Sequence, residues 1–190
     1  DQVEAMTLGT RVVVMKLGLK SNEVRLVDYT PEWKEEFLRV KKEIRETTKL
    51  DENRIEHIGS TAIKGMSAKP IIDILVGVDD LSKVTKDLFK DFYRAGFLRL
   101  NVERSGEIVL AKFTDDAYEE KTHFIHLVEY QKELWNNLIF FRDYLNSNAI
   151  ARKQYIEIKI EYLRKSSTGI NEYTDFKEQF VKSIFKKRIR

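Results

Sequence analysis

A carboxylate, Asp73, lies inside an otherwise apolar run, Ile71-Ile72-Asp73-Ile74-Leu75-Val76. Apart from Asp73, the residues from Pro70 to Val78 that would point to either face of a strand are apolar. This pattern predicts a central strand that is buried on both faces. An ionised carboxylate at such a place costs free energy unless a cation or hydrogen-bond donors meet it. Two interpretations stay open. One is a structural ion pair with Lys69 or with an arginine of the C-terminal segment, and the other is a divalent-metal ligand near the end of a central strand.

Strand-like and helix-like periods around Asp73 indicate the fold class. Runs of β-prone residues lie at Glu23–Tyr29, Ile55–Ile58, Pro70–Val78, Phe97–Leu100, Glu107–Phe113 and His123–Tyr130. Helical stripes are formed by Trp33, Phe37, Val40 and Ile44 and by Leu81, Val84, Leu88, Phe92 and Ala95, and helical periods continue from Tyr130 to the C-terminus. We therefore expect an α+β or α/β domain, with a mixed sheet of about five strands and a C-terminal helical cover.

Length and composition favour a single domain. With 190 residues, 42% of them hydrophobic, the chain can bury one substantial core. We expect residues 24–190 to form this domain. Residues 1–23 show no sustained period, and Met15 lies where a natural start codon can stand, so we interpret this stretch as an N-terminal extension or a remnant of cloning.

Charge and cysteine content exclude several functions. The 34 basic residues nearly balance the 31 acidic ones, for a net charge of +3, which argues against a nucleic-acid partner. The chain has no cysteine, which excludes disulfides, zinc–thiolate sites and thiol nucleophiles. No apolar stretch reaches the roughly 20 residues that span a bilayer, so we expect no membrane partner and, by default, a cytoplasmic location.

The segment after the predicted strand 55–58 is a candidate phosphate-binding turn. Gly59, Ser60 and Thr61 stand where a strand gives way to a turn, a geometry in which backbone N–H groups can point at an anion and hydroxyls can add donors. An ordinary structural turn is the alternative. Lys69 and Arg142 are the cations that we expect to neutralise a bound phosphate.

All three histidines of the chain, His57, His123 and His126, fall in predicted strands. Because side chains alternate along a strand, His123 and His126 point to opposite faces. His57 is a candidate ligand-binding residue, and His126 is a candidate metal ligand together with Asp73. One carboxylate and one imidazole suit a transition metal better than magnesium. A hydrogen-bonded histidine in the core or at its rim is the alternative.

A further candidate surface lies on the helix predicted after residue 149. Arg152, Tyr155, Lys159 and Tyr162 recur at steps of three, four and three, so they share one helical face. Tyr155 and Lys159 are candidate ligand-binding residues, because an aromatic ring can stack on a base and an ammonium can bind phosphate. A solvated surface stripe is the alternative.

Several of these segments together resemble the GrpB family. The resemblance rests on Ile55-Glu56-His57-Ile58-Gly59-Ser60-Thr61-Ala62 followed by Gly65-Met66-Ser67-Ala68-Lys69-Pro70-Ile71-Ile72-Asp73-Ile74. Tyr29-Thr30-Pro31-Glu32-Trp33, His123-Phe124-Ile125-His126-Leu127 and Phe140-Phe141-Arg142-Asp143-Tyr144-Leu145 agree with it in the same order. The resemblance runs from about Val24 to the C-terminus. It implies the nucleotidyltransferase fold, and a similar domain occurs fused to dephospho-CoA kinase.

The resemblance also implies a metal site that this sequence matches only in part. Nucleotidyltransferases usually place a Gly-Ser turn about a dozen residues before two carboxylates spaced i and i+2, which project to one face of a strand and hold two magnesium ions. Gly59-Ser60 and Asp73 match this pattern, but Leu75 stands at the i+2 position. The expected cofactor is Mg2+ or Mn2+, held by Asp73 and His126.

Two functions remain open from the sequence. The first is binding of a nucleotide or another phosphorylated small molecule, with metal-dependent nucleotidyl transfer to an unknown acceptor and Asp73 as the catalytic residue. The second is a non-catalytic module that has lost the two-metal site and binds a ligand or steadies a protein partner. A carboxylate such as Glu56, Glu103 or Glu107 that reaches the face of Asp73 discriminates between them.

Overall fold

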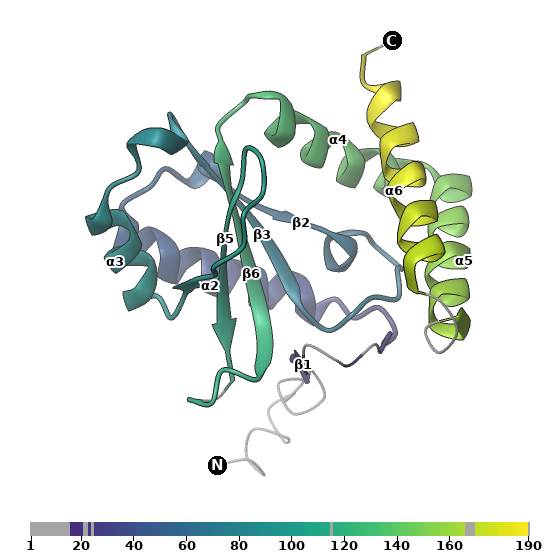
Figure 1. The fold of residues 1–190 in the computed structure, drawn as a ribbon, viewed down its shortest axis with the longest axis horizontal. Helices are drawn as coiled ribbons and strands as arrows, with labels where there is room; N and C mark the ends of the chain where they lie inside the picture. The colour runs from purple at the N-terminus through teal and green to yellow at the C-terminus, as the bar shows by residue number, and fades with distance from the viewer. Residues whose placement is uncertain (1–15, 21–22, 24, 115, 166–169, 190) are drawn as a thin grey trace.

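The computed structural model describes residues 16–20, 23, 25–114, 116–165 and 170–189 (Figure 1). Most of the stretch 1–23, which the sequence marks as an extension, lies outside the described residues. Within the described ranges, no helix combines the length and the apolar character needed to cross a bilayer.

Six strands form one mixed sheet, which confirms the predicted fold class. The strands are β1 (Leu19–Lys20), β2 (Ile55–Ile58), β3 (Ile72–Val78), β4 (Leu98–Arg99), β5 (Ile108–Phe113) and β6 (Glu120–Glu129). Their order is β2-β3-β6-β5-β4, with β1 paired to β6. The central pair β3–β6 is parallel, and the other pairs are antiparallel. The apolar run around Asp73 is therefore the second strand of the sheet, with β2 on one side and β6 on the other (Figure 1).

The prediction of a strand at residues 23–29 is wrong. This segment contributes only an isolated bridge between Val27 and Ala68, and the additional short strand forms earlier, at β1. Val27 instead packs from the side against the main core. The β-prone residue Val27 therefore contacts the core without belonging to a strand of the sheet.

The helices and short helical turns lie around the sheet. They are α2 (Glu32–Thr48), η2 (Glu52–Arg54), η3 (Ser60–Ala62), η4 (Leu81–Lys83), α3 (Lys86–Arg94), α4 (Glu133–Ser147), α5 (Ala149–Lys165) and α6 (Ile170–Lys187). The helix expected from Leu81 begins one turn later. Asp80 accepts a hydrogen bond from the Ser82 backbone N–H at 2.9 Å and caps η4, whereas the Thr85 hydroxyl accepts from the Leu88 N–H at 3.2 Å and starts α3.

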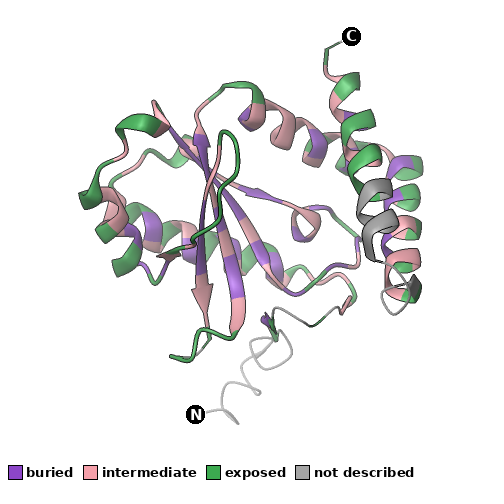
Figure 2. Ribbon diagram, in the orientation of Figure 1, coloured by how far each residue is buried: buried purple, intermediate pink, exposed green. Residues whose placement is uncertain are grey.

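Alternation of side chains gives the sheet two differently covered faces. On one face, the predicted stripe of α2 packs on Ile72, Ile74 and Val76 of β3, and this is the main core. On the other face, Leu75 packs with Trp135 of α4. The strands carry more buried residues than the helices do, and the outward faces of the helices are exposed (Figure 2). Asp73 shares its face with Leu75 and therefore points away from α2.

The last three helices form the predicted C-terminal cover. Helices α5 and α6 lie side by side at one end of the sheet, and α4 joins them to β6 (Figure 1). Their apolar side chains enclose Ile63 and Met66, which come from the loop between β2 and β3. This packing fixes the loop that carries Gly59 and Ser60 against α5.

A buried polar contact between α2 and β6 makes the stability of the protein depend on pH in the acidic range. Glu36 Oε1 lies 3.1 Å from His123 Nε2, and Arg39 also binds Glu36. Burial raises the pKa of Glu36, but hydrogen bonds from His123 and Arg39 outweigh it and leave the pKa at about 2 instead of 4.5. Because the folded-state pKa is depressed, this stabilisation is present above pH 4.5 and is lost as the pH falls toward 2.

We expect Glu36→Gln to remove about 1–3 kcal/mol of stability at neutral pH and to flatten the acid branch of the stability profile. Chemical denaturation at a series of pH values, on the wild type and the variant, measures both effects. Two parallel profiles between pH 2 and 4.5 would show that Glu36 does not titrate with the lowered pKa.

Candidate functional site

Asp73, His126 and Glu107 form a row of polar side chains on the face of the sheet that points away from α2. His126 Nε2 lies 3.0 Å from Asp73 Oδ1, and His126 Nδ1 is in hydrogen-bond contact with Glu107 Oε1. The three side chains come from β3, from β6 and from the residue before β5. They are partly buried, with 31%, 18% and 13% of the Asp73, His126 and Glu107 side chains exposed. Asp73 is therefore paired with a histidine and not with Lys69 or an arginine.

The two carboxylates determine the charge of His126. Each accepts a hydrogen bond from a different ring nitrogen, so the imidazole carries a proton on both nitrogens. Burial lowers the pKa of His126, but the hydrogen bonds to Asp73 and Glu107 outweigh it and raise the pKa to about 9. At neutral pH this side chain is an imidazolium held between two carboxylates.

Gly59 allows the backbone to approach Asp73. Its φ is 74°, in the left-handed region, and a Cβ at this position would lie 2.5 Å from Asp73 Oδ2. A side chain other than hydrogen therefore collides with the carboxylate. The glycine of the predicted phosphate-binding turn is required for contact with Asp73, whatever else the turn binds.

Ser60 and Lys159 meet beside this turn. The Lys159 ammonium donates hydrogen bonds to the Ser60 hydroxyl and, at 3.2 Å, to the Ser67 carbonyl. Lys159 is only 9% exposed. Burial lowers its pKa to about 7, repulsion from Lys177 and Lys69 adds to this effect, and Asp73 opposes it.

Lys69 and Lys177 complete a group of three cations, which we call the lysine cluster (Lys69, Lys159 and Lys177). Lys69 is exposed, and its pKa is lowered by partial desolvation of its ammonium and by repulsion from Lys177. Its ammonium lies 5.8 Å from the centre of the Tyr162 ring. Lys177, on α6, is exposed and was missed by sequence reasoning, because nothing in its local pattern distinguishes it from other surface lysines.

Two residues of the predicted site, Thr61 and His57, are buried and contact each other. Thr61 is 4% exposed, and its hydroxyl lies 2.8 Å from His57 Nε2. His57 stacks on Phe37 of α2, on the face opposite Asp73, and burial lowers its pKa to about 4. In this structure Thr61 and His57 bind each other inside the core, so the phosphate-binding role of Thr61 and the ligand-binding role of His57 stay predictions.

Arg142 and Tyr155 also have structural partners. Arg142 Nη1 donates to Glu56 Oε2 at 2.8 Å and to the His57 carbonyl at 3.1 Å, which joins α4 to β2. The Tyr155 ring is 4% exposed and packs against neighbouring aromatic rings of the helical cover. A phosphate role for Arg142 would require these bonds to break, and the expected base-stacking face at Tyr155 is covered.

The donor set around Asp73 does not fit the two-metal site that the sequence resemblance implies. Leu75, at the i+2 position, is fully buried in the apolar cluster under α4. Glu107 does reach this face, but it binds the far side of the His126 ring. Within the part of the chain that the structure describes, no group of three or more acidic or histidine side chains is arranged to hold a metal ion.

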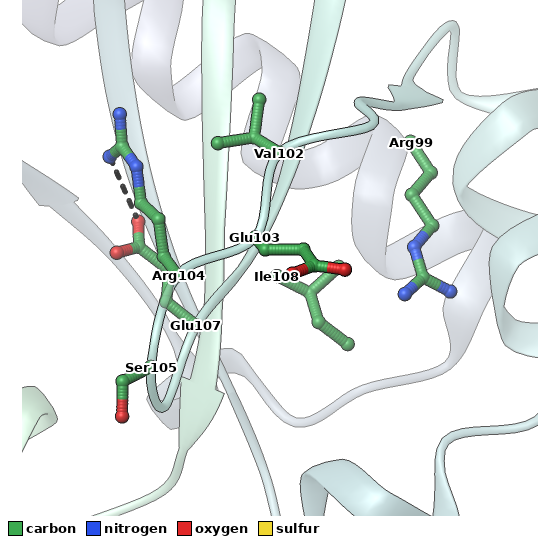
Figure 3. Close-up of a pocket in the computed structure, with 7 residues that line it drawn as sticks. All are labelled: Arg99, Val102, Glu103, Arg104, Ser105, Glu107 and Ile108. Carbon is green, nitrogen blue, oxygen red and sulfur yellow. Dashed lines mark ion pairs between the residues drawn. The ribbon is translucent and has the colours of Figure 1, made fainter.

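A hollow opens beside Glu107, between the loop that joins β4 to β5 and the start of β5 (Figure 3). Its volume is about 440 Å³, and it is lined by Arg99, Val102, Glu103, Arg104, Ser105, Glu107 and Ile108. Arg104 Nη1 lies 3.8 Å from Glu107 Oε1 (Figure 3). Glu107 thus links the hollow to His126 and, through it, to Asp73.

Sequence comparison gives relatives over most of the chain. The chain is 43% identical over 169 residues to the glutamate-rich protein GrpB of Alkalihalophilus pseudofirmus. These residues cover 88% of this chain and 97% of that protein. It is 27% identical over 188 residues to dephospho-CoA kinase of Mycobacterium tuberculosis, covering 86% of this chain but only 45% of the kinase.

Structure comparison gives the same result and places the fold. The crystal structure of the conserved protein GrpB from Enterococcus faecalis superposes with a TM-score of 0.71 at 28% identity, covering 87% of this chain and all of that one. The Cid1 poly(U) polymerase superposes with a TM-score of 0.51 at 15% identity, over 73% of this chain and 44% of that one, which shows a related nucleotidyltransferase-like fold. The family model described as GrpB protein matches residues 23–187, and the chain belongs to the GrpB family.

Proposed function

We propose that this protein binds a nucleotide or another phosphorylated small molecule at the lysine cluster, beside Ser60. The observation that carries the proposal is the state of Lys159. Its ammonium is almost fully buried and is bonded to a hydroxyl and a carbonyl. In the described part of the chain, no carboxylate forms an ion pair with it, and the carboxylate that acts on it electrostatically is Asp73.

An anion would relieve the cost of this arrangement. A buried ammonium without a paired charge is destabilising, and the charge of Lys177 lowers the pKa of both Lys159 and Lys69. A phosphate group between Lys69 and Lys159 would accept charge-assisted hydrogen bonds and cancel the repulsion. The Ser60 hydroxyl stands at the same place as a further donor.

The comparisons suggest which ligands should be tested first. The Cid1 structures on a related fold are described as holding 3'-dATP or GTP with magnesium, so nucleotides are the first class to test. Precursors of coenzyme A are the second class, because a related domain makes up less than half of a dephospho-CoA kinase. We propose binding, and not nucleotidyl transfer, as the function that the geometry supports best, because Leu75 replaces one carboxylate of the metal-binding pair.

A thermal-shift screen tests the proposal without an assumed reaction. The four ribonucleoside triphosphates and the coenzyme A precursors are added singly, because a ligand that binds only the folded state raises the melting temperature. We expect at least one of them to raise it, and Lys159→Met to abolish most of that shift. The matched control is Lys153→Met, which removes an exposed lysine of the same helix and should keep the shift.

Two results would contradict the proposal. One is a screen in which no phosphorylated ligand changes the melting temperature of the wild type. The other is a ligand that stabilises Lys159→Met as strongly as it stabilises the wild type, because this ligand would bind away from the lysine cluster.

A further inference from the structure

We propose that this site binds its phosphorylated ligand without a divalent metal, because His126, held between Asp73 and Glu107, already binds both carboxylates that a metal ion would need. The statement about the ligand rests on the function proposed above. The statement about the metal concerns the protein alone and is testable without a ligand.

Both ring nitrogens of His126 are already used. Nδ1 and Nε2 lie on different sides of the imidazole ring, and each contacts a carboxylate oxygen of a different residue. A metal can bind an imidazole only through a nitrogen lone pair. Metal binding would therefore require His126 to break its contact with Asp73 or Glu107.

The register of the sheet supplies no second carboxylate next to Asp73. Its partners in register are Ile58 on β2 and Phe124 on β6. The partners of Leu75 are Glu56 on β2 and His126 on β6. Glu56 is bonded to Arg142 at 2.8 Å, which already neutralises it.

The local charges are balanced without a metal ion. His126 lies between Asp73 and Glu107, and Arg104 lies 3.8 Å from Glu107 on the side of the hollow (Figure 3). Two carboxylates are thus matched by one imidazolium and one guanidinium. The lysine cluster adds further positive charge, since Asp73 acts electrostatically on both Lys69 and Lys159. The summed field of these side chains attracts an anion and repels a divalent cation.

The metal part of the proposal is tested with Mn2+ alone. Electron paramagnetic resonance measures free Mn2+, and we expect the wild-type protein to leave the signal unchanged up to millimolar Mn2+. His126→Asp removes the imidazolium and adds a carboxylate beside Asp73, so this variant should gain Mn2+ binding by about tenfold or more. His126→Asn is the matched control, because it removes the imidazolium without adding a charge and should bind less Mn2+ than His126→Asp.

The ligand part is tested by repeating the thermal-shift measurement in EDTA. A ligand that stabilises the wild type should do so equally in EDTA and in magnesium. Wild-type binding of Mn2+ in the micromolar range that is lost in Asp73→Asn would overturn the proposal, as would a ligand shift that disappears in EDTA. If the variants at position 126 do not fold, the wild-type titration still decides. A screen without any stabilising ligand would contradict the proposed function. The Mn2+ titration would still test the statement about the metal.

Discussion

Gly59→Ala should destabilise the protein by about 2–4 kcal/mol, because it combines a strained backbone with a collision. Alanine at a φ of 74° is strained, and its Cβ would lie 2.5 Å from Asp73 Oδ2 and 3.0 Å from Asp73 Cβ. Displacement of Oδ2 would turn the same carboxylate group whose Oδ1 contacts His126 Nε2. Chemical denaturation of the wild type and the variant measures the loss.

Gly65→Ala is the matched control for this prediction. Gly65 has a similar φ of 78°, but no heavy atom lies within 4 Å of the position that its Cβ would take. Only the backbone strain remains, and we expect a cost of about 1 kcal/mol. Equal losses for the two variants would show that Gly59 does not depend on its approach to Asp73.

His126→Ala should cost about 2–4 kcal/mol at neutral pH, since it leaves two partly buried carboxylates without their shared cation. The effect should depend on pH in a defined direction. The folded-state pKa of His126 is raised from 6.5 to about 9, so its stabilisation is complete below pH 6.5 and is lost as the pH rises through 9. Denaturation profiles of the wild type and His126→Ala should therefore approach each other above pH 9.

A different pH profile would exclude the imidazolium. If the stability difference between wild type and His126→Ala stays constant from pH 6.5 to beyond 9, the ring is neutral throughout and one carboxylate carries the missing proton. Leu134→Ala is a suitable control for general loss of packing, because this partly buried side chain packs against the apolar cluster that contains Leu75, on the same face of the sheet.

Local patterns were sufficient to predict most elements of this fold. The stripe Trp33, Phe37, Val40 and Ile44 is buried as its period predicts, and the strand at 55–58 has the expected bounds. The helix expected from Leu81 was misplaced, because the capping signal of Asp80 and the capping signal of Thr85 lie close together in sequence. Each begins a helical turn, and only the second continues as an α-helix.

The site was harder to predict, because its contacts join distant segments. The sequence showed that Asp73 needs a partner, but the partner is His126, which only the parallel pairing of β3 with β6 brings close. Similarly, the helical period placed Tyr155 and Lys159 on one face, but it did not show whether other parts of the chain cover that face. Aromatic rings of α4 and α6 pack on Tyr155, and the loop between β2 and β3 contacts Lys159, so both side chains are buried.

The ionisation of Lys159 tests most directly whether a phosphorylated ligand binds at the lysine cluster. Nuclear magnetic resonance of protein with isotope-labelled lysine follows the ammonium through a pH titration, first alone and then with a ligand that raises the melting temperature. In the free protein, Lys159 should titrate with a pKa of about 7. An anion beside the ammonium should raise this pKa toward the ordinary 10.5, because it stabilises the charged form. A ligand that binds and leaves the pKa of Lys159 unchanged would contradict the account.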